Sequence, residues 1–349
     1  TQFDELYRCQ AVILTAGTFM RSVMHCGQNQ SEGGRAGDSS ANHISVSLKE
    51  LGFDLLRLKT GTPARLKKGS IRFEVLQRED GDKEPVPFSF YTIPNPFPLL
   101  EQQPCFLTYT NSFTHEVIAE SKNLSPMFTG QILGRGPRYC PSIEDKVFRF
   151  ADKDRHQIFL EPESVFSQEI YANGLSTSLP LSVQEKFLRT IKGLEAVEIA
   201  RPGYAVEYDA INPVSLNHKL ESKAHPGLYF AGQVNGTSGY EEAAAQGLVA
   251  GINAACSVRG LDPFIMGRAE SYIGVLIDDL VTKGVDEPYR MFTSRCEYRL
   301  LLREDNADKR LAAAGRGLGL LGEQKWRQFC VKQENIERTT SLLKETYLY

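Results

Sequence analysis

One segment in the second half of the chain constrains the fold more than any other. The apolar run Gly227-Leu-Tyr-Phe-Ala231 predicts a buried strand, residues 232–239 form a glycine-rich loop, and residues 240–258 predict a long helix. Strand, glycine loop and helix in this order are typical of nucleotide-binding units in doubly wound α/β proteins. The loop lets the backbone approach a ligand, and the helix presents free N–H groups to an anion.

Small residues recur along one face of that predicted helix. Ala243, Gly247 and Gly251 are spaced four residues apart, so this face carries almost no side chain. Such a face can lie against a cofactor, or it can simply pack closely against a sheet. The pattern leaves both interpretations open and does not identify a cofactor.

The beginning of the chain carries a related pattern. Ala11-Val-Ile-Leu14 predicts a parallel strand buried on both faces, and it runs into a tight turn over residues 15–18. A glycine-rich loop follows at 32–38, then a predicted helix at about 44–51 and a basic turn at 59–65.

The pattern changes between residues 67 and 216. Short runs at 71–76, 105–110, 157–160 and 204–208 alternate with Pro, Gly and Asn, and helices are predicted at 114–122 and 183–191. The proline-rich stretch 85–104 predicts a long irregular connection. The predicted fold class is α/β: a doubly wound, Rossmann-like domain over 1–66 and 217–260, split by a strand-rich α+β insertion over 67–216 and followed by a helical segment over 261–349.

Composition excludes several classes of protein. No apolar run approaches the roughly 18–20 residues of a membrane span, so no membrane association is expected. The net charge of −3 gives no general attraction for nucleic acid, so an RNA ligand needs a local basic patch. The seven cysteines are scattered without a C-x-x-C pair, which argues against a disulfide framework and a metal site and fits a reducing compartment.

Cys140 is the cysteine whose sequence surroundings most favour reactivity. It precedes Pro141-Ser142, a predicted helix start, and both a helix N-terminus and nearby cations favour the thiolate. Glu144 opposes this effect, so the sign of the pKa shift stays open. The nearby cations are Arg135, Arg138 and Lys146. A lone cysteine is nevertheless more often an inert buried thiol, so both interpretations of Cys140 stay open.

Two sets of basic residues are candidates for binding phosphate or substrate. The first set is Arg295, Arg299 and Arg303, which are spaced four residues apart. If this segment is a helix, the three side chains line one face and could contact successive phosphates, or they could pair with nearby acids on an ordinary solvated face. The second set lies in glycine-rich turns, where side chains are better placed to contact a ligand. It comprises Arg35, Lys59 and Arg65.

Residues 231–251 and 134–150 resemble, almost residue for residue, the two long signatures of the MnmG/GidA family. Gly33-Gly-Arg-Ala-Gly37, Lys59-Thr-Gly-Thr-Pro63 and residues 289–306 resemble the family as well. The resemblance implies an FAD-binding domain split by an insertion and followed by the start of a helical domain. The family's G-x-G-x-x-G fingerprint lies upstream of the matching part, and the chain opens without Met, so we expect a piece of a longer protein.

The resemblance also implies roles for particular residues. The resemblance places FAD contacts on Gly232 and Gln233. Many flavoproteins carry an acidic residue at the position of Gln233, and the family pattern also has Gln there. The turn at 15–18 resembles a second flavoprotein element. The catalytic role falls on Cys140, and NADH binding falls near residues 136–150. Relatives often carry serine at the position of Ala41, so a side-chain contact to flavin there is in doubt. The implied cofactor-binding residues are Thr15, Ala16, Gly17, Thr18, Gly136, Pro137, Arg138, Gly232 and Gln233.

The function implied by the resemblance is FAD-dependent tRNA modification. A carboxymethylaminomethyl or aminomethyl group is installed at C5 of the wobble uridine, with methylene-tetrahydrofolate as carbon donor and NADH as reductant. The implied partners are tRNA, the GTPase MnmE and a second copy of the chain. The expected compartment is the cytoplasm, or the mitochondrial matrix for a eukaryotic source.

Two other functions remain open at the level of sequence. One is a small-molecule flavin oxidoreductase, which would turn over NADH without tRNA. The other is a binding scaffold without catalysis, because the first FAD segment of the family is absent from this chain.

Overall fold

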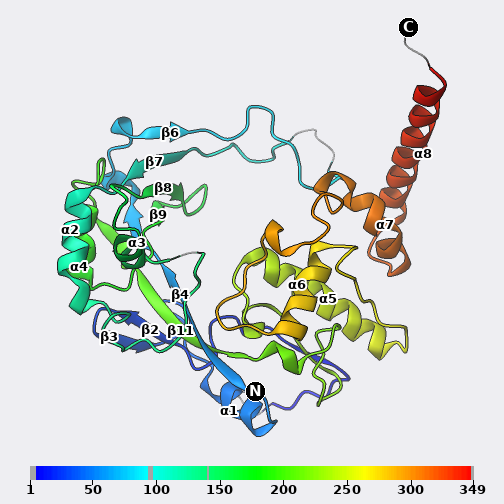
Figure 1. Ribbon diagram of the computed structural model, residues 1–349, viewed down its shortest axis with the longest axis horizontal. Helices are drawn as coiled ribbons and strands as arrows, with labels where there is room; N and C mark the ends of the chain where they lie inside the picture. The colour runs from blue at the N-terminus through cyan, green and yellow to red at the C-terminus, as the bar shows by residue number, and fades with distance from the viewer. Residues whose placement is uncertain (1–4, 93–96, 140, 347–349) are drawn as a thin grey trace. The chain divides into compact units, whose positions relative to one another are not determined.

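The computed structural model describes residues 5–92, 97–139 and 141–346 (Figure 1). The chain folds into two compact units. The first contains the residues up to Gly81 together with Gln102–Phe264 and Asp279–Arg290, and the second contains Asp82–Glu101, Ile265–Asp278 and the chain from Met291 onward. The mixed α/β architecture agrees with the predicted fold class.

A parallel strand pair carries the glycine loops. Strand β1 (Val12–Leu14) pairs with β12 (Leu228–Phe230), with Leu14 opposite Phe230. Helix α5 follows and spans Tyr240–Val258, the bounds that the sequence predicts. The predicted burial of the first strand on both faces is wrong, since Val12 is 45% and Ile13 36% exposed. In the described part of the chain this sheet has only two strands, so β1 has a strand neighbour on one side alone.

The predicted insertion, 67–216, contains most of a six-stranded antiparallel sheet covered by three helices; the strand at Arg65–Lys67 begins two residues before the predicted start. The order of the sheet is β10-β5-β9-β8-β7-β6. Ile118 of α2, Ile143 of α3 and Phe187 of α4 are fully buried with Leu160 and Ile170 of the sheet, so the helices and the sheet share one core. The strands are β5 (Arg65–Lys67), β6 (Gln77–Glu79), β7 (Cys105–Tyr109), β8 (Gln157–Pro162), β9 (Glu169–Asn173) and β10 (Ile199–Arg201). The helices are α2 (Ser112–Glu120), α3 (Ile143–Arg149) and α4 (Leu181–Leu188).

A four-stranded antiparallel sheet has the order β3-β2-β11-β4. Figure 1 shows its two long strands, β4 (Leu55–Thr62) and β11 (Tyr204–Ile211), which pair along their whole length. Residues 204–208 were predicted as a strand of the insertion, but they belong to this sheet because β11 pairs with β4 and β2. The other two strands of this sheet are β2 (Val23–Cys26) and β3 (Asn29–Glu32). Helix α1 (Asn42–Glu50), which was predicted at 44–51, lies between β3 and β4 in the chain.

The run at 71–76, predicted as strand-like, forms a 3-10 turn at Phe73–Val75. The Leu76 N–H bonds the Phe73 carbonyl at 3.1 Å. Ile71 belongs to the insertion core, and Phe73 and Leu76 pack against it. These apolar side chains therefore reach the core from a turn, which explains why the alternating pattern was misleading.

The second unit is mainly helical, with α7 (Ala307–Gly317) and α8 (Glu323–Glu345); α6 (Tyr272–Lys283) contributes residues to both units. None of the described helices is both long and apolar enough to span a membrane.

Arg295, Arg299 and Arg303 do not share a helical face. Residues 293–295 form a 3-10 turn, followed by turns rather than an α-helix. Cys296 and Leu302 are buried against Val275, and Arg268 donates to the carbonyl of Arg295 at 3.2 Å. These contacts hold the backbone away from a regular helix.

Candidate functional site

The two glycine segments that lie far apart in the sequence leave the parallel strand pair side by side. The Ala231 N–H donates to the carbonyl of Leu14 at 3.1 Å, extending the pairing of β1 and β12 to their ends. The turn at 15–18 and the loop at 232–239 therefore start from the same edge. In open α/β sheets, ligands bind at the carboxyl ends of the parallel strands, which is this edge.

A cavity of about 660 Å³ opens there. Its volume lies within the range of about 300–1,000 Å³ that is usual for small-molecule sites. The walls come from both loops, from β4 and β9, from α5 and from residue 290. The lining residues are Thr15, Gly17, Thr60, Tyr171, Asn173, Ala231, Gly232, Gln233, Ser238, Gly239, Tyr240, Glu241, Ala243, Gly247 and Arg290.

The small-residue face of α5 borders this cavity. Ala243 and Gly247 line it, and a Cβ added at Gly247 would meet no atom within 4 Å. Gly232 is also required by its backbone, because its φ of +86° lies in the left-handed region that disfavours side chains. Of the two interpretations of this face left open by the sequence, the structure favours the ligand-facing one at Gly247.

Arg290 supplies the only positive charge among the described residues that line the cavity, and Glu241 the only negative charge. The guanidinium lies 3.6 Å from the carboxylates of both Glu241 and Glu242, beside the N-terminus of α5. A Cβ at Gly239 would overlap the side chains of Arg290 and Glu242. Sequence reasoning missed Arg290, because its proximity to the loop depends on a long-range backbone bridge between Thr237 and Tyr289.

Buried polar groups support the loop. Asn235, fully buried, donates to the carbonyl of Phe230 at 2.9 Å and to Gln246 Oε1 at 2.8 Å. Its Oδ1 has no hydrogen-bond partner within the described residues. Burial raises the pKa of Tyr208 far above its usual range, the Tyr139 hydroxyl raises it further, and the adjacent Gln233 amide partly opposes the shift. A neutral phenol therefore lies beside the amide that lines the cavity.

The segment leading to Cys140 is anchored on β4 and β11. Glu207 of β11 accepts the N–H groups of Leu133 at 2.9 Å and Gly134 at 2.6 Å. Its other carboxylate oxygen lies 2.9 Å from Nε2 of the buried His25. Burial alone would raise the pKa of Glu207, but the hydrogen bonds from His25 and Gly134 and the charge of Arg57 bring it below its usual value. The structure thus fixes this segment with a buried carboxylate.

The predicted site residues fall into different settings. Cys140 lies outside the described residues. Lys59 is buried against Gly136, with its ammonium 3.4 Å from Met127 Sδ. Glu144, the acid predicted to oppose thiolate formation at Cys140, accepts the Ser178 N–H at 2.9 Å. Thr15, Gly17, Gly232 and Gln233 line the cavity together; Ala16 and Thr18 belong to the same turn, and Thr18 donates to the carbonyl of Gly34 at 2.8 Å.

Arg35 and Arg303 make ion pairs within their own segments, whereas Arg65 pairs with a residue distant in the sequence. Arg35 is 73% exposed and bonds Asp38 of its own loop at 2.6 Å. Arg65 pairs with Glu163 at 3.0 Å and stacks over the ring of Tyr171, so it supports a wall residue of the cavity. Arg303 pairs with Asp305 at 2.9 Å. Arg295, Arg299 and Arg303 belong to the second compact unit.

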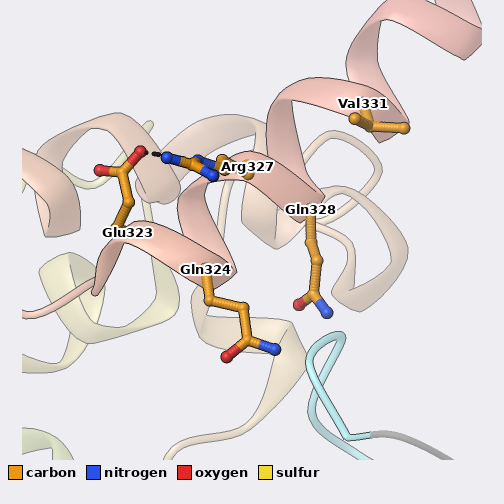
Figure 2. Close-up of a pocket in the computed structure, with 5 residues that line it drawn as sticks. All are labelled: Glu323, Gln324, Arg327, Gln328 and Val331. Atoms are coloured by element: carbon orange, nitrogen blue, oxygen red, sulfur yellow. Dashed lines mark hydrogen bonds and ion pairs between the residues drawn. The ribbon is translucent and has the colours of Figure 1, made fainter.

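Another hollow, of about 610 Å³, runs along α8 in the second unit. Figure 2 shows its lining side chains, among them Glu323 and Arg327, which form an ion pair of 3.0 Å. All the lining residues come from one helix, so no groups converge on it from other elements, as they do in most ligand sites. Within the described residues, no group of three or more His, Cys, Asp or Glu side chains could hold a metal ion.

Comparisons with known proteins agree on one family. A family model described as "Glucose inhibited division protein A" (GIDA) matches residues 1–262. The chain is 54% identical over 348 residues to the tRNA uridine 5-carboxymethylaminomethyl modification enzyme MnmG of a Nitratiruptor species, covering 100% of this chain and 56% of that protein. It is also 54% identical over 349 residues to the MnmG of Helicobacter pylori, with the same coverage.

Solved structures give the same result. Aquifex aeolicus GidA in its form I crystal matches with a TM-score of 0.91 and 50% identity, covering 97% of this chain and 57% of that one. The chain therefore spans about half the length of the curated relatives it matches.

Proposed function

Because the chain belongs to the GidA family, we propose that it forms part of an FAD-dependent enzyme that installs a carboxymethylaminomethyl group at C5 of a tRNA uridine, at the wobble position. The observation that carries the proposal is the cavity where the turn after β1 and the loop after β12 meet, in a chain whose relatives are named for this modification.

The residues around the cavity fit a dinucleotide cofactor. The side-chain-free surface at Gly247 and the glycines of both loops leave room for a large ligand, and Gln233 and Ser238 supply polar groups in the lining. Thr15, Gly17, Gly232 and Gln233 would hold FAD, with Arg290 as the one cationic group among the described lining residues. When bound, FAD supplies two-electron redox chemistry. The chain's own residues bind and orient it, and Tyr208 stays protonated beside Gln233.

Cys140 is proposed as the nucleophile. Uracil C5 is a poor nucleophile until a group adds to C6, and a thiolate can form that C–S bond by conjugate addition. The electron pair released towards C5 then attacks the one-carbon unit, so that a C–C bond forms while a C–N bond to tetrahydrofolate breaks and its electron pair passes to that nitrogen. Loss of the C5 proton and breakage of the C–S bond restore the aromatic base and the thiolate.

Co-substrates and partners complete the proposal. The carbon comes from methylene-tetrahydrofolate, the substituent is completed by glycine or ammonium, and NADH is the reductant, bound near residues 136–150. The working protein is a homodimer with the GTPase MnmE as partner. The names of the relatives support the tRNA uridine and its substituent. The other components are implied by the family resemblance.

Release of tritium from tRNA labelled at uridine C5 tests this proposal. In the complete enzyme of which this chain forms part, we expect release that requires FAD, methylene-tetrahydrofolate, NADH and the partner GTPase; we expect this piece alone to be inactive. In the complete enzyme, Cys140→Ala should lose the release, while Cys105→Ala, which removes a thiol on β7 of the insertion, should retain it. FAD binding, followed by flavin fluorescence, should survive Cys140→Ala. NADH oxidation that proceeds equally well without tRNA, and without tritium release, would instead identify a small-molecule oxidoreductase.

A further inference from the structure

A short segment after α6 contacts both the glycine loop and the segment that leads to Cys140. Its position is fixed at Tyr289, whose N–H donates to the carbonyl of Gly236 at 2.8 Å and whose hydroxyl donates to Asp279 at 2.8 Å. The Ser238 N–H donates to the carbonyl of Tyr289 at 2.8 Å, and Val285 packs where a Cβ of Gly236 would lie. Residues 285–290 are therefore held firmly against the loop.

This segment presents two consecutive carboxylates to two arginines. The Nε of Arg138 lies 2.8 Å from each carboxylate oxygen of Glu287. Arg135 Nη1 lies 3.8 Å from the carboxylate of Asp286 and 3.5 Å from its carbonyl oxygen. The hydrogen bonds and charge of Glu287 raise the pKa of Arg138. The Arg138 guanidinium thus bonds a carboxylate of the same chain, and the Arg135 guanidinium lies near a second one.

The two sides of this contact differ in exposure. Arg135 and Arg138 are 71% and 72% exposed, whereas Glu287 is 21% exposed. The backbone of Arg135 is fixed on β4, because its carbonyl accepts the Lys59 N–H at 2.9 Å. The arginine side chains therefore project from an anchored backbone into solvent, where a ligand can reach them.

We propose that Arg135 and Arg138 form a phosphate-binding site and that Asp286 and Glu287 occupy it until a phosphate group displaces them. A guanidinium fork matches carboxylate and phosphate oxygens equally well, so the acidic pair stands in for the ligand. Both arginines and Asp286 are more than 70% exposed, and ion pairs with exposed partners contribute little to stability, so the exchange costs little. The inference rests on the proposed function, which supplies two phosphate sources: the tRNA backbone and the pyrophosphate of NADH.

Neutralising Glu287 should therefore improve binding. We would measure the dissociation constants of unmodified tRNA and of NADH at several salt concentrations, using the unaltered chain, Glu287→Gln and Arg138→Gln. The matched control is Glu198→Gln, which removes the same charge from an exposed ion pair with Lys67 at 2.7 Å. Thermal unfolding of each variant would show whether the fold is retained.

We expect Glu287→Gln to tighten binding of one of the two ligands about three- to tenfold at low salt, with the gain shrinking as salt rises. Glu198→Gln should change it much less. The double variant Arg138→Gln/Glu287→Gln should bind the ligand no more tightly than Arg138→Gln alone, because the two residues no longer interact once the arginine is replaced. A gain for tRNA alone identifies backbone phosphates, and a gain for NADH alone identifies the dinucleotide.

An equal effect of Glu287→Gln and Glu198→Gln on both ligands, or a gain that persists with Arg138→Gln, would overturn the inference while leaving the proposed function intact. If the unaltered chain and Glu287→Gln bind neither tRNA nor NADH, the proposed function and the inference both fail.

Discussion

The Ala231 N–H bonds the Leu14 carbonyl at 3.1 Å. Through this contact, a turn near the start of the chain and a loop in its second half share one edge of a parallel strand pair. Thr15 and Gly17 come from the first segment, Gly232 and Gln233 from the second, and all four line the same cavity.

Gly247→Ala should stabilise the chain and weaken FAD binding. Alanine in place of glycine within a helix raises the free energy of unfolding by about 0.5–1 kcal/mol, and a Cβ at Gly247 meets no protein atom within 4 Å. The same Cβ projects from a lining residue of the cavity. Denaturant unfolding and an FAD titration measure the two effects.

Gly251→Ala is the control for that experiment. A Cβ there also meets open space, but Gly251 is not among the described residues that line the cavity. It should give the same stabilisation with unchanged FAD affinity. Equal loss of affinity in both variants, or no loss in either, would show that the α5 face does not contact FAD.

Gly239→Ala should have the opposite effect on stability. Gly239 has φ +126° and ψ 146°, a region that only glycine occupies readily, which costs another residue about 1–3 kcal/mol. The new Cβ would also overlap Glu242 and Arg290. We expect a lower free energy of unfolding and weaker FAD binding. An unfolding curve that matches the unaltered chain would contradict the described loop.

Glu207→Gln should lower stability at neutral pH by about 1–3 kcal/mol, because a buried, charge-assisted hydrogen-bond network is disrupted. Since the folded pKa of Glu207 lies below its ordinary value of 4.5, its contribution is present above that value and is lost as pH falls through the folded pKa. Unfolding measured from pH 7 downward should therefore fall less steeply in Glu207→Gln. Parallel curves would contradict the assignment.

The neighbouring rings of His115 and His156, tilted by 38° with centroids 5.2 Å apart, should make the insertion sensitive to mild acid. Burial lowers the pKa of both; Asp154 partly opposes this at His115, while the charges of His115 and Lys146 lower the pKa of His156 further. The unfolded chain then binds more protons below pH 6.5, so stability is complete above 6.5 and declines as pH falls.

His156→Gln should flatten this decline, as measured by thermal unfolding between about pH 5 and 8. His218→Gln, a histidine outside this pair, serves as the control and should keep the slope of the unaltered chain. An unchanged slope in His156→Gln would show that this pair does not titrate in that window.

Local patterns predicted the local elements well. The bounds of α5 follow from its uninterrupted run of helix-forming residues after a glycine loop, and α1, α2 and α4 lie within a few residues of their predicted ranges. The prediction was wrong for 71–76, where apolar side chains reach the core from a turn. The arginine run, for which a helix was one possibility, forms turns in which Cys296 and Leu302 are buried.

Long-range pairing explains what sequence could not supply. Arg290 reaches the cavity because Tyr289 bridges to the loop at Gly236 and Ser238, and no local pattern encodes that bridge. Glu207 of β11 likewise accepts the N–H of Gly134, a residue 73 positions earlier in the chain. Of residues 285–290, only Tyr289 and Arg290 belong to a stretch that resembles the family. No local pattern pairs Asp286 and Glu287 with arginines that lie far earlier in the chain.

The most direct test of the account is a crystal structure of the chain with FAD bound. We predict one FAD molecule in contact with both the turn at 15–18 and the loop at Gly232-Gln233, lying along the α5 face at Gly247. An FAD that touches only one of the two loops, or binds elsewhere on the molecule, would contradict it.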